Sequence, residues 1–316
     1  MNIELHHGVA GFYKIEAVRI DKDGQEIGRR VVADWFENLI TNQGLDRLGT
    51  DHPYNSIQFC LVGSGSTAPS NGDTQLVSQV ASTSTELSSP SGAQPSAPYY
   101  GWVRRTYRFG AGVAAGNLSE VGVGWGSSGA VLFSRALIRD GSGNPTTITV
   151  LADEILDVTY ELRNYPFLDG IAGSFEIGAT TYTTEMRAAN VTSDYGIFTG
   201  GWGLQYPFNV MQQNPQYLPT RLYAGASFGA ITGEPTGATQ TMSGLWNSSG
   251  NYVAGTYQRT ATAKWPVGTE ITNANMAFFA FGGCTTQMSI SPATLSKTNA
   301  QELTITVTVS WGRYTP

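Results

Sequence analysis

The sequence EILDVTYELRNY, residues 154–165, alternates apolar and polar side chains in the pattern of a long, half-buried β-strand. The chain ends on a similar stretch, LTITVTVSWGRY at 303–314. When the two stretches are aligned on their final tyrosines, Leu156, Val158, Tyr160 and Leu162 fall on Ile305, Val307, Val309 and Trp311. We therefore expect each stretch to close one β module, and we expect the two modules to be an internal duplication.

Other stretches recur in the same order in the two halves. FCLVG at 59–63 corresponds to RLYAG at 221–225 in the second half, and VRRTYRFG at 103–110 corresponds to YQRTATAKW at 257–265. EVGVGWGS at 120–127 corresponds to MAFFAFGG at 276–283. The lengths differ mainly in the loops, as expected of diverged tandem modules. We predict two β-sandwich-like modules, residues 1–168 and 169–316, and an all-β fold class.

The composition also favours a protein of strands and turns. Only 13% of the 316 residues are charged, about half the usual share, and glycine occurs 38 times. The net charge of −6 argues against a nucleic-acid-binding face, which requires an excess of basic residues. No apolar run of about 18 residues occurs, so we expect no membrane span. The first residues, MNIELHHG, lack the pattern of a secretion signal, which predicts folding in the cytoplasm.

One short helix is predicted near 36–48, within WFENLITNQGLDRLG at 35–49. Thr41 or Asn42 is the expected N-cap of a short piece running to Arg47, and Gly49 is a natural stop. In the second half, WGLQYPFNVMQQ at 202–213 falls at the corresponding place, although its proline disfavours a regular helix.

A β-hairpin is predicted before that helix, because residues 12–20 and 26–32 alternate like strands around the turn DKDG at 21–24. Asp21, Asp23 and Gly24 resemble the start of a calcium-binding loop. The later acidic ligands of such a loop are missing, so we expect a plain turn.

The two cysteines, Cys60 and Cys284, lie in the apolar stretches FCLVG and FGGCTT. In a reducing cytoplasm this setting predicts two free, buried thiols. A disulfide between the two halves is the alternative interpretation.

Two groups of charged residues are candidates for a site. Arg104, Arg105 and Arg108 lie on the predicted strand 101–109 and can bind an anion, but edge-strand arginines more often face solvent or pair with carboxylates. Asp157 and Glu161 share one face of the strand 154–165, next to the acidic pair Asp153-Glu154. We interpret them as a solvated or interface-facing stripe.

The sequence offers no catalytic set. The histidines His6, His7 and His52 are too few to predict a metal site, and the glycine-rich loop GSGSTAPSNGDTQL at 63–76 lacks the Gly-Lys-Ser/Thr of a phosphate-binding loop. No common hydrolase or zinc-protease motif occurs. We therefore predict no enzyme activity, no catalytic or metal-binding residues and no cofactor. Aromatic residues, at 11%, can supply stacking platforms for sugars without requiring that role.

Four stretches of the first half carry a resemblance to a known group of proteins: FENLITNQGLDRL (36–48), VGSGSTAPSNGDTQL (62–76), RRTYRFGAGVAAGNLSEVGVGW (104–125) and LFSRALIRDGSGNPTTITVLADEILDVTYELRNYP (132–166). Their order and spacing resemble those of tailed-bacteriophage virion proteins, mostly tail or tail-fibre-associated structural proteins. The second half keeps the layout but loses most of the matching residues. The group supplies no catalytic residues to carry over.

The resemblance implies a non-enzymatic structural component of a bacteriophage virion, assembled in the host cytoplasm through β-module interfaces. Its expected partners are other copies of itself and neighbouring virion proteins. A capsid decoration or head–tail connector protein is one alternative, and a module that binds a host receptor or glycan is another. A depolymerase is a third, although no paired-carboxylate motif favours it.

Overall fold

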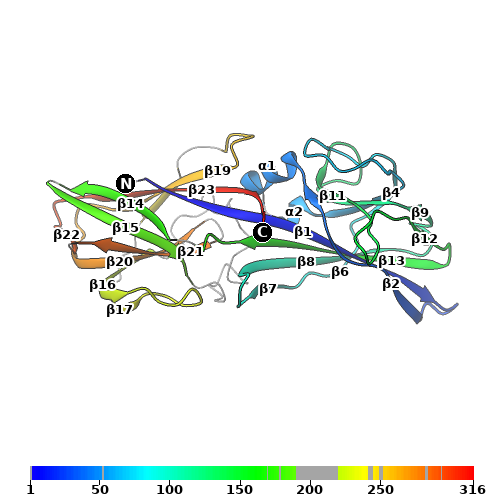
Figure 1. Cartoon of the computed structure of the whole chain (residues 1–316), viewed down its shortest axis with the longest axis horizontal. Coiled ribbons are helices and arrows are strands. Elements are labelled where there is room, and N and C mark those ends of the chain that lie inside the picture. The colour runs from blue at the N-terminus through cyan, green and yellow to red at the C-terminus, as the bar shows by residue number, and fades with distance from the viewer. Residues whose placement is uncertain are drawn as a thin grey trace. The chain divides into compact units, whose positions relative to one another are not determined.

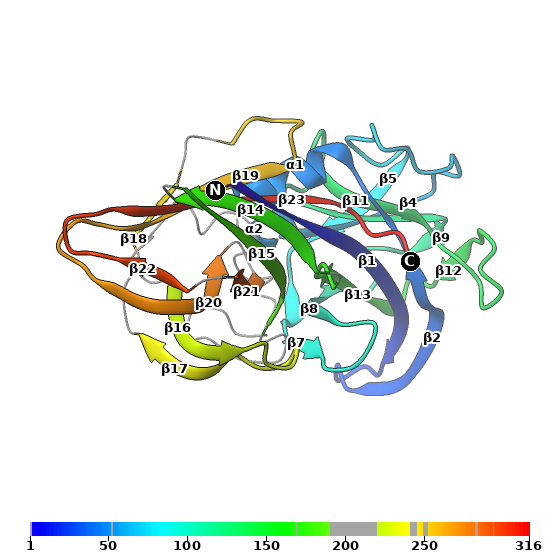
Figure 2. The same cartoon turned by 60° about the vertical axis from the view of Figure 1, so that its left-hand side comes forward.

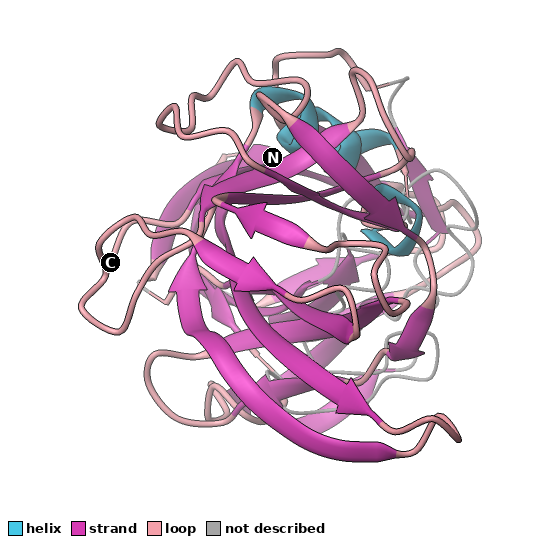
Figure 3. Cartoon of the chain, turned by 90° about the vertical axis from the view of Figure 1, so that its right-hand side faces the viewer, coloured by secondary structure: helices cyan, strands magenta, loops and turns pink. Residues whose placement is uncertain are grey.

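The stretch Glu154–Tyr165 forms strand β13 in the computed structural model of the chain, and its four apolar positions are fully buried. The C-terminal stretch forms β23 (Leu303–Arg313), with its four apolar positions buried as well. The structure describes residues 2–51, 53–168, 170–177, 179–189, 220–240, 245–248, 252–281, 284–292 and 294–316. Strands dominate these residues, which include only two helices (Figure 3), so the fold class is all-β as predicted.

The chain divides into two compact units. The N-terminal unit comprises residues 9–91 and 103–163, and the C-terminal unit comprises residues 1–8, 92–102 and 164–316. This division differs from the predicted modules 1–168 and 169–316 because residues 1–8 and 92–102 group with the later part of the chain. The physical reason is strand length: β1 (Asn2–Ile20), β8 (Tyr100–Phe109) and β13 each contribute residues to both units.

These long strands belong to a nine-stranded sheet with the order β18-β19-β23-β1-β13-β8-β6. Its remaining strands are β2 (Glu26–Glu37), which pairs with β1, β6 (Glu86–Ser88), β7 (Ser91–Gln94), which pairs with β8, β18 (Leu245–Ser248) and β19 (Gln258–Trp265). Strands β1 and β2 are antiparallel, which confirms the predicted hairpin. Asp21 closes its turn by accepting hydrogen bonds from the backbone N–H groups of Asp23 and Gln25.

A second sheet completes the N-terminal unit. Its order is β3 (Leu39–Ile40), β11 (Leu132–Leu137), β10 (Glu120–Gly124), β4 (Phe59–Gly63) and β5 (Gln79–Thr83). The short strands β9 (Gly116–Leu118) and β12 (Ile148–Val150) pair with each other. The nine-stranded and five-stranded sheets contact each other through buried side chains. The hydroxyls of Tyr13 on β1 and Ser134 on β11 lie 2.8 Å apart, and the ring of Phe133 on β11 meets that of Tyr160 on β13 edge to face.

Helix α1 (Asn42–Thr50) lies beside β11, and α2 (Pro53–Ser56) follows it (Figure 1). The predicted N-cap Thr41 is confirmed, because its hydroxyl accepts the backbone N–H of Gly44 at 3.0 Å. The predicted start of the helix near residue 36 is wrong: Phe36 belongs to β2 and Ile40 to β3, and both are buried. Burial against neighbouring strands outweighs the weak helical pattern of these residues.

The second sheet of the C-terminal unit has the order β14 (Ile171–Ile177), β15 (Thr180–Ala188), β21 (Cys284–Ser291), β20 (Ile271–Phe281), β16 (Thr220–Ser227) and β17 (Thr236–Gln240), and β22 (Leu295–Lys297) pairs with β20 (Figure 2). Tyr223, Met276 and Phe278 form part of its core. The stretch WGLQYPFNVMQQ at 202–213 lies outside the described residues.

The two halves repeat one set of strand neighbours. The hairpin β4–β5 corresponds to β16–β17, the pair β4–β10 to β16–β20, and the pair β10–β11 to β20–β21. In the nine-stranded sheet, β8 is next to β13 as β19 is next to β23. The hydroxyls of Thr106 and Thr159 lie 3.0 Å apart, and those of Thr260 and Thr308 lie 2.9 Å apart at the corresponding positions.

An aromatic cluster in the C-terminal unit joins the ends of three strands. The rings of Tyr165 and Tyr314 stack with centroids 3.6 Å apart, and Tyr100 packs against Tyr165. Gly8 makes room for this stack, because a Cβ atom there would lie 2.7 Å from the Tyr314 ring. His7 is fully buried beside it, with Nδ1 3.2 Å from Oδ1 of Asn164.

His7 makes the stability of the chain depend on pH. Burial, together with the nearby charge of His6, lowers the pKa of His7 from 6.5 to about 4, although the hydrogen bond with Asn164 acts in the opposite direction. Between these two pH values the unfolded chain binds a proton that the folded chain does not. The free energy of unfolding should therefore fall by up to about 3 kcal/mol as the pH drops from 6.5 to 4.

Urea unfolding of the parent and of His7→Leu across this pH range measures the effect. The difference between the two stability curves should shrink towards low pH. His6→Leu is the comparison variant: it removes only the smaller contribution of the nearby charge and keeps the buried ring of His7, so most of the slope of the parent should remain. Parallel curves for the parent and His7→Leu would contradict the assignment.

Candidate functional site

The loop between β4 and β5, residues 64–78, is held to the N-terminal unit by one buried carboxylate. Oε1 of Glu120 accepts the backbone N–H groups of Gly65 at 3.0 Å and Ser78 at 2.7 Å, and Oε2 accepts that of Val77 at 3.2 Å. Glu120 is fully buried on β10. A single side chain therefore fixes both ends of the loop, which we call the anchored loop.

Arg135 of β11 completes this anchor. Its Nε donates to Oε2 of Glu120 at 2.8 Å, one Nη donates to Asp73 and the other to the carbonyl oxygen of Thr67, both at 2.7 Å. The Arg135 side chain is only 1% exposed. The guanidinium thus links the sheet to the middle of the anchored loop through three different acceptors.

The strand register explains why these groups meet. Gly122 faces Arg135 across β10 and β11, so Glu120 lies diagonally from Arg135 on the same face. Gly63 faces Glu120 across β4 and β10, and a Cβ atom at Gly63 would lie 2.7 Å from the carboxylate oxygen. The glycines of VGSGS therefore leave the space that the carboxylate occupies, a role that the sequence analysis did not assign to them.

Further contacts hold the loop near its tip. The backbone N–H of Asn42 donates to the carbonyl oxygen of Asn71 at 2.8 Å, and the amide of Gln43 donates to that of Thr74 at 3.0 Å. Leu76 packs into a small apolar cluster below. The exposed residues of the tip present neutral hydroxyl and amide groups: Ser66, Thr67, Ser70 and Asn71.

A buried ion pair is an expensive way to stabilise a fold, because both charges lose their hydration. Apolar residues of similar volume often stabilise a protein as well or better. We infer that the Glu120–Arg135 pair serves mainly to give the anchored loop a single conformation. Residues that bind other molecules often lie on long loops that the rest of the protein holds in one conformation.

A second arrangement of charges lies on the sheet face formed by β2, β8 and β13. Asp157 is 1% exposed and receives two hydrogen bonds from Arg108, at 2.8 and 2.7 Å, and one from Arg29 at 3.0 Å. The pKa of Arg108 is raised, chiefly by its hydrogen bonds to Asp157. This bidentate geometry binds β8 to β13 and β2 through charge as well as through backbone pairing.

Two further carboxylates of β13 have the same environment. Glu161 is paired with both Arg104 and Arg163. Glu154 is paired with Arg30 at 2.9 Å and lies 3.7 Å from Arg19. Burial raises the pKa of Glu154, but hydrogen bonds from Arg30 and from the backbone of residue 151 outweigh it, so the net pKa is lowered. Each of the three buried carboxylates on β13 thus has two arginines.

These contacts correct one prediction and confirm another. The expectation of a solvated or interface-facing stripe at Asp157 and Glu161 is wrong, because both side chains are buried beneath arginines of the same chain. The expectation that the arginines of 101–109 pair with carboxylates is confirmed: Arg104 pairs with Glu161, Arg105 with Glu86 and Arg108 with Asp157. Of the neighbouring acidic pair, Asp153 is exposed and only Glu154 is buried.

The remaining candidate residues lie apart from these arrangements. His6 lies 3.0 Å from the hydroxyl of Ser310, and His52 is outside the described residues. No group of three or more potential metal ligands gathers within the described ranges. Cys60 is free and buried, which raises the pKa of its thiol, whereas the Cys284 side chain is outside the described part. None of the helices in the described residues is long and apolar enough to cross a membrane.

Comparison of the chain with known protein families, with curated proteins and with solved structures found no match. A proposal for its function therefore depends on the anchored loop, on the arginine–carboxylate face and on the sequence patterns above.

Glu120→Gln should lower the free energy of unfolding by about 3–5 kcal/mol, because it removes the buried carboxylate from Arg135 and leaves only the partly exposed Asp73 to balance the buried charge. Urea unfolding measures this loss, and hydrogen exchange at the amides of Gly65 and Ser78 measures loosening of the anchored loop. Asp51→Asn is the control, since Asp51 forms a partly exposed pair with Arg47 and its loss should cost at most about 1 kcal/mol. Parental stability and exchange in Glu120→Gln would disprove the anchor.

Asp157→Asn should lower the free energy of unfolding by about 1–3 kcal/mol, because Arg108 and Arg29 both lose the carboxylate charge of Asp157. The loss is limited because both arginines can turn towards solvent. Thermal and urea unfolding report the change. The matched control is Asp153→Asn on the adjacent exposed turn, which should lie within about 0.5 kcal/mol of the parent. Equal effects of the two substitutions would show that the buried position of Asp157 has no energetic consequence.

Proposed function

We propose that the chain is a non-enzymatic structural component of a tailed-bacteriophage particle, located in the tail or with the tail fibres, and that it acts by binding. The observation that carries this proposal is that the buried carboxylates bind groups of the protein itself. Glu120, Glu154, Asp157 and Glu161 are each held by arginine and fix strands or a loop. General acid–base chemistry needs a carboxylate that reaches a substrate, and these four reach protein groups instead.

The resemblance to virion proteins supports the same function. It covers residues 36–166, which include the anchored loop, both residues of its anchor and the whole of β13. The residues that carry the resemblance are thus largely the residues that make the N-terminal unit rigid. A rigid β scaffold that presents a fixed polar loop suits repeated assembly with other proteins.

We propose the anchored loop as the assembly contact. Its tip carries hydroxyl and amide groups, which can hydrogen-bond to a folded protein surface without a charged partner. The expected partners are other copies of this chain and neighbouring virion proteins, joined in the host cytoplasm. A capsid decoration or head–tail connector protein would use the same scaffold, so the position in the particle is the first property to test.

We also infer that the two halves arose by duplication. The matching strand neighbours support this, and so do the two threonine pairs, Thr106–Thr159 and Thr260–Thr308, which occupy corresponding positions. A duplicated module supplies two related surfaces from one gene, and only the first retains the residues that resemble the virion proteins.

The test uses purified phage particles. Mass spectrometry should detect the chain in them at a constant copy number, and an antibody against the chain should label the tail in negative-stain images. Labelling of the head would favour the decoration or connector alternative. Absence of the chain from particles, despite its synthesis in infected cells, would contradict a structural role.

Particles assembled in cells that supply only a variant chain test the contact. Asn71→Arg at the exposed loop tip should leave the thermal melt unchanged and prevent incorporation of the chain. Ser142→Arg, on the exposed turn between Asp140 and Asn144, is the matched control and should be incorporated normally. Normal incorporation of both variants would exclude the anchored loop as the contact.

A further inference from the structure

Strand β14 forms one edge of the seven-stranded sheet in the C-terminal unit. Among the described residues it pairs with β15 alone, and Ile171–Ile177 match the residues of β15 one to one without a register shift. Ala172, Ser174 and Glu176 are exposed. The strand is therefore a regular edge, and none of the described strands covers its second side.

Three other edge strands, β2, β5 and β17, are less regular. Each has a register shift against its neighbour, and β2 also contains the charged pair Arg29 and Arg30. Bulges and charges commonly prevent an edge strand from pairing with another chain. β14 has no register shift, no proline and one charged residue, Glu176. This lack of protection favours a partner strand at the edge of β14.

The ladder between β14 and β15 shows which backbone groups face the open edge. The N–H of Glu185 lies 3.3 Å from Oγ of Ser289 on β21, so it points away from β14. In an antiparallel ladder, the backbone groups of two opposite residues point either both toward the partner strand or both away from it. Ala172 is opposite Glu185 and therefore directs its N–H and C=O groups to the open edge. By alternation, Ser174 and Glu176 do the same.

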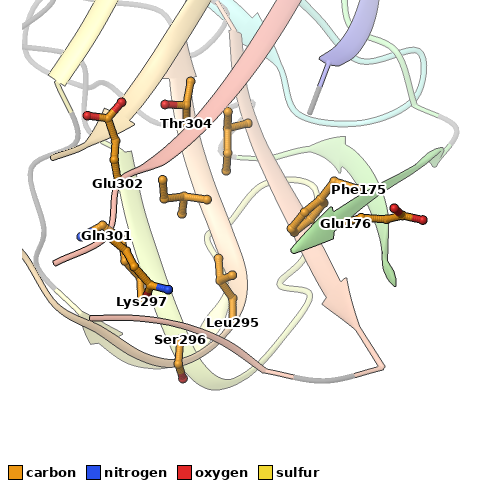
Figure 4. Close-up of a pocket in the computed structure, with 10 residues that line it drawn as sticks. Phe175, Glu176, Leu295, Ser296, Lys297, Gln301, Glu302 and Thr304 are labelled. Atoms are coloured by element: carbon orange, nitrogen blue, oxygen red, sulfur yellow. The ribbon is translucent and has the colours of Figure 1, made fainter. Parts of the chain in front are cut away.

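A pocket of about 360 Å³ lies beside β14. Figure 4 shows Phe175 on one side of it and Leu295 on the other, and Leu303 and Ile305 add to the apolar lining. The ring of Tyr182 stacks on that of Phe175, with centroids 5.0 Å apart and planes 9° apart, and so restricts its rotation. Apolar space thus lies next to the open edge.

We propose that β14 pairs with β14 of a second copy of this chain, in antiparallel orientation about a two-fold axis at Ser174. The pairing joins the seven-stranded sheets of the two copies into one continuous sheet. Ala172, Ser174 and Glu176 exchange backbone hydrogen bonds with the same three residues of the other copy. Ala172 then lies opposite the partner's Glu176, and Ser174 lies opposite the partner's Ser174.

The residues of β14 suit this register. Gly173 lies opposite the partner's Phe175, and a glycine leaves room for an aromatic ring to pack over its backbone. Both residues are half-buried on the face that lines the pocket, so the partner's Phe175 extends the apolar lining. Glu176 lies opposite the partner's Ala172, so like charges do not face each other. A second copy therefore matches this edge in shape and in charge.

This contact is separate from the anchored loop and does not depend on a role in a phage particle. A seven-residue strand buries less surface than a standard interface, so the dimer should be weak in solution, with a Kd of about 10–100 µM. A chain that is absent from particles can still dimerise, and a chain that is incorporated can stay monomeric in solution. The two proposals therefore fail in distinguishable ways.

Sedimentation equilibrium of the full chain from about 1 to 500 µM measures the dimer, and the parent should change from monomer to dimer across this range. Ser174→Pro should weaken dimerisation by about tenfold or more with an unchanged thermal melt. The reason is that the N–H that proline removes faces the open edge and not β15. Ser174→Thr is the matched control, because it keeps this N–H and should dimerise as the parent does.

Ser174→Cys tests the register and replaces Ser174→Pro if that variant fails to fold. The two-fold axis places the two substituted residues opposite each other with Cα atoms about 5.5 Å apart, a separation that a disulfide can span. Mild oxidation should therefore crosslink two copies. Thr181→Cys, at an exposed position one strand further from the edge, is the control and should not crosslink.

Four results would overturn the pairing. They are a parent that stays monomeric throughout the range, a Ser174→Pro dimer as strong as that of the parent, and a dimer that Ser174→Cys does not crosslink. The fourth is a crosslink from Ser174→Cys to a different protein in infected cells, which would assign this edge to that protein.

Discussion

The pairing of buried carboxylates with arginine is the constraint on which the N-terminal unit depends. Backbone pairing alone positions β8, β13 and β10, but it does not determine what their polar faces contact. Arg108 and Arg29 converge on Asp157, and Arg135 converges with three backbone N–H groups on Glu120. Each carboxylate forms hydrogen bonds with segments that are distant in the sequence. The few charged residues of this chain therefore stabilise contacts in its interior as well as on its surface.

This placement of charge also explains what the sequence could and could not predict. Period-two alternation identified β13 and β23 correctly, because burial of one face of a strand leaves a direct record in the sequence. The same alternation assigns Asp157 to the outer face and says nothing of what covers that face. Arg29 of β2 and Arg108 of β8 do so, and only the fold brings these two residues together.

The anchor of the loop escaped prediction for a related reason. Glu120 stands among glycines and valines in a strand that is buried throughout, where a lone acidic residue gives no periodic signal. Its partners are backbone N–H groups and Arg135, none of which forms a motif with it in the sequence. The prediction of a helix over 36–48 was wrong at its start for a different reason. The N-cap at Thr41 is a local signal and was predicted, whereas Phe36 and Ile40 lie in strands because they are buried against neighbouring strands.

The two halves differ at the position of one ion pair. In the alignment on the final tyrosines, Asp157 corresponds to Thr306, and the alignment of the Arg-Thr pairs places Arg108 on Thr262. Thr262 and Thr306 face each other across β19 and β23, and their hydroxyls lie 3.2 Å apart. An ion pair at this position in one half is thus a hydroxyl pair in the other.

The residues on both strands differ together, so each half has a contact across the two strands, and the chemistry of that contact differs between the halves. Hydroxyl pairs need neither long side chains nor matched charges, and they leave the surrounding sheet face neutral. The two halves thus share a set of strand neighbours without sharing the side chains that connect those strands.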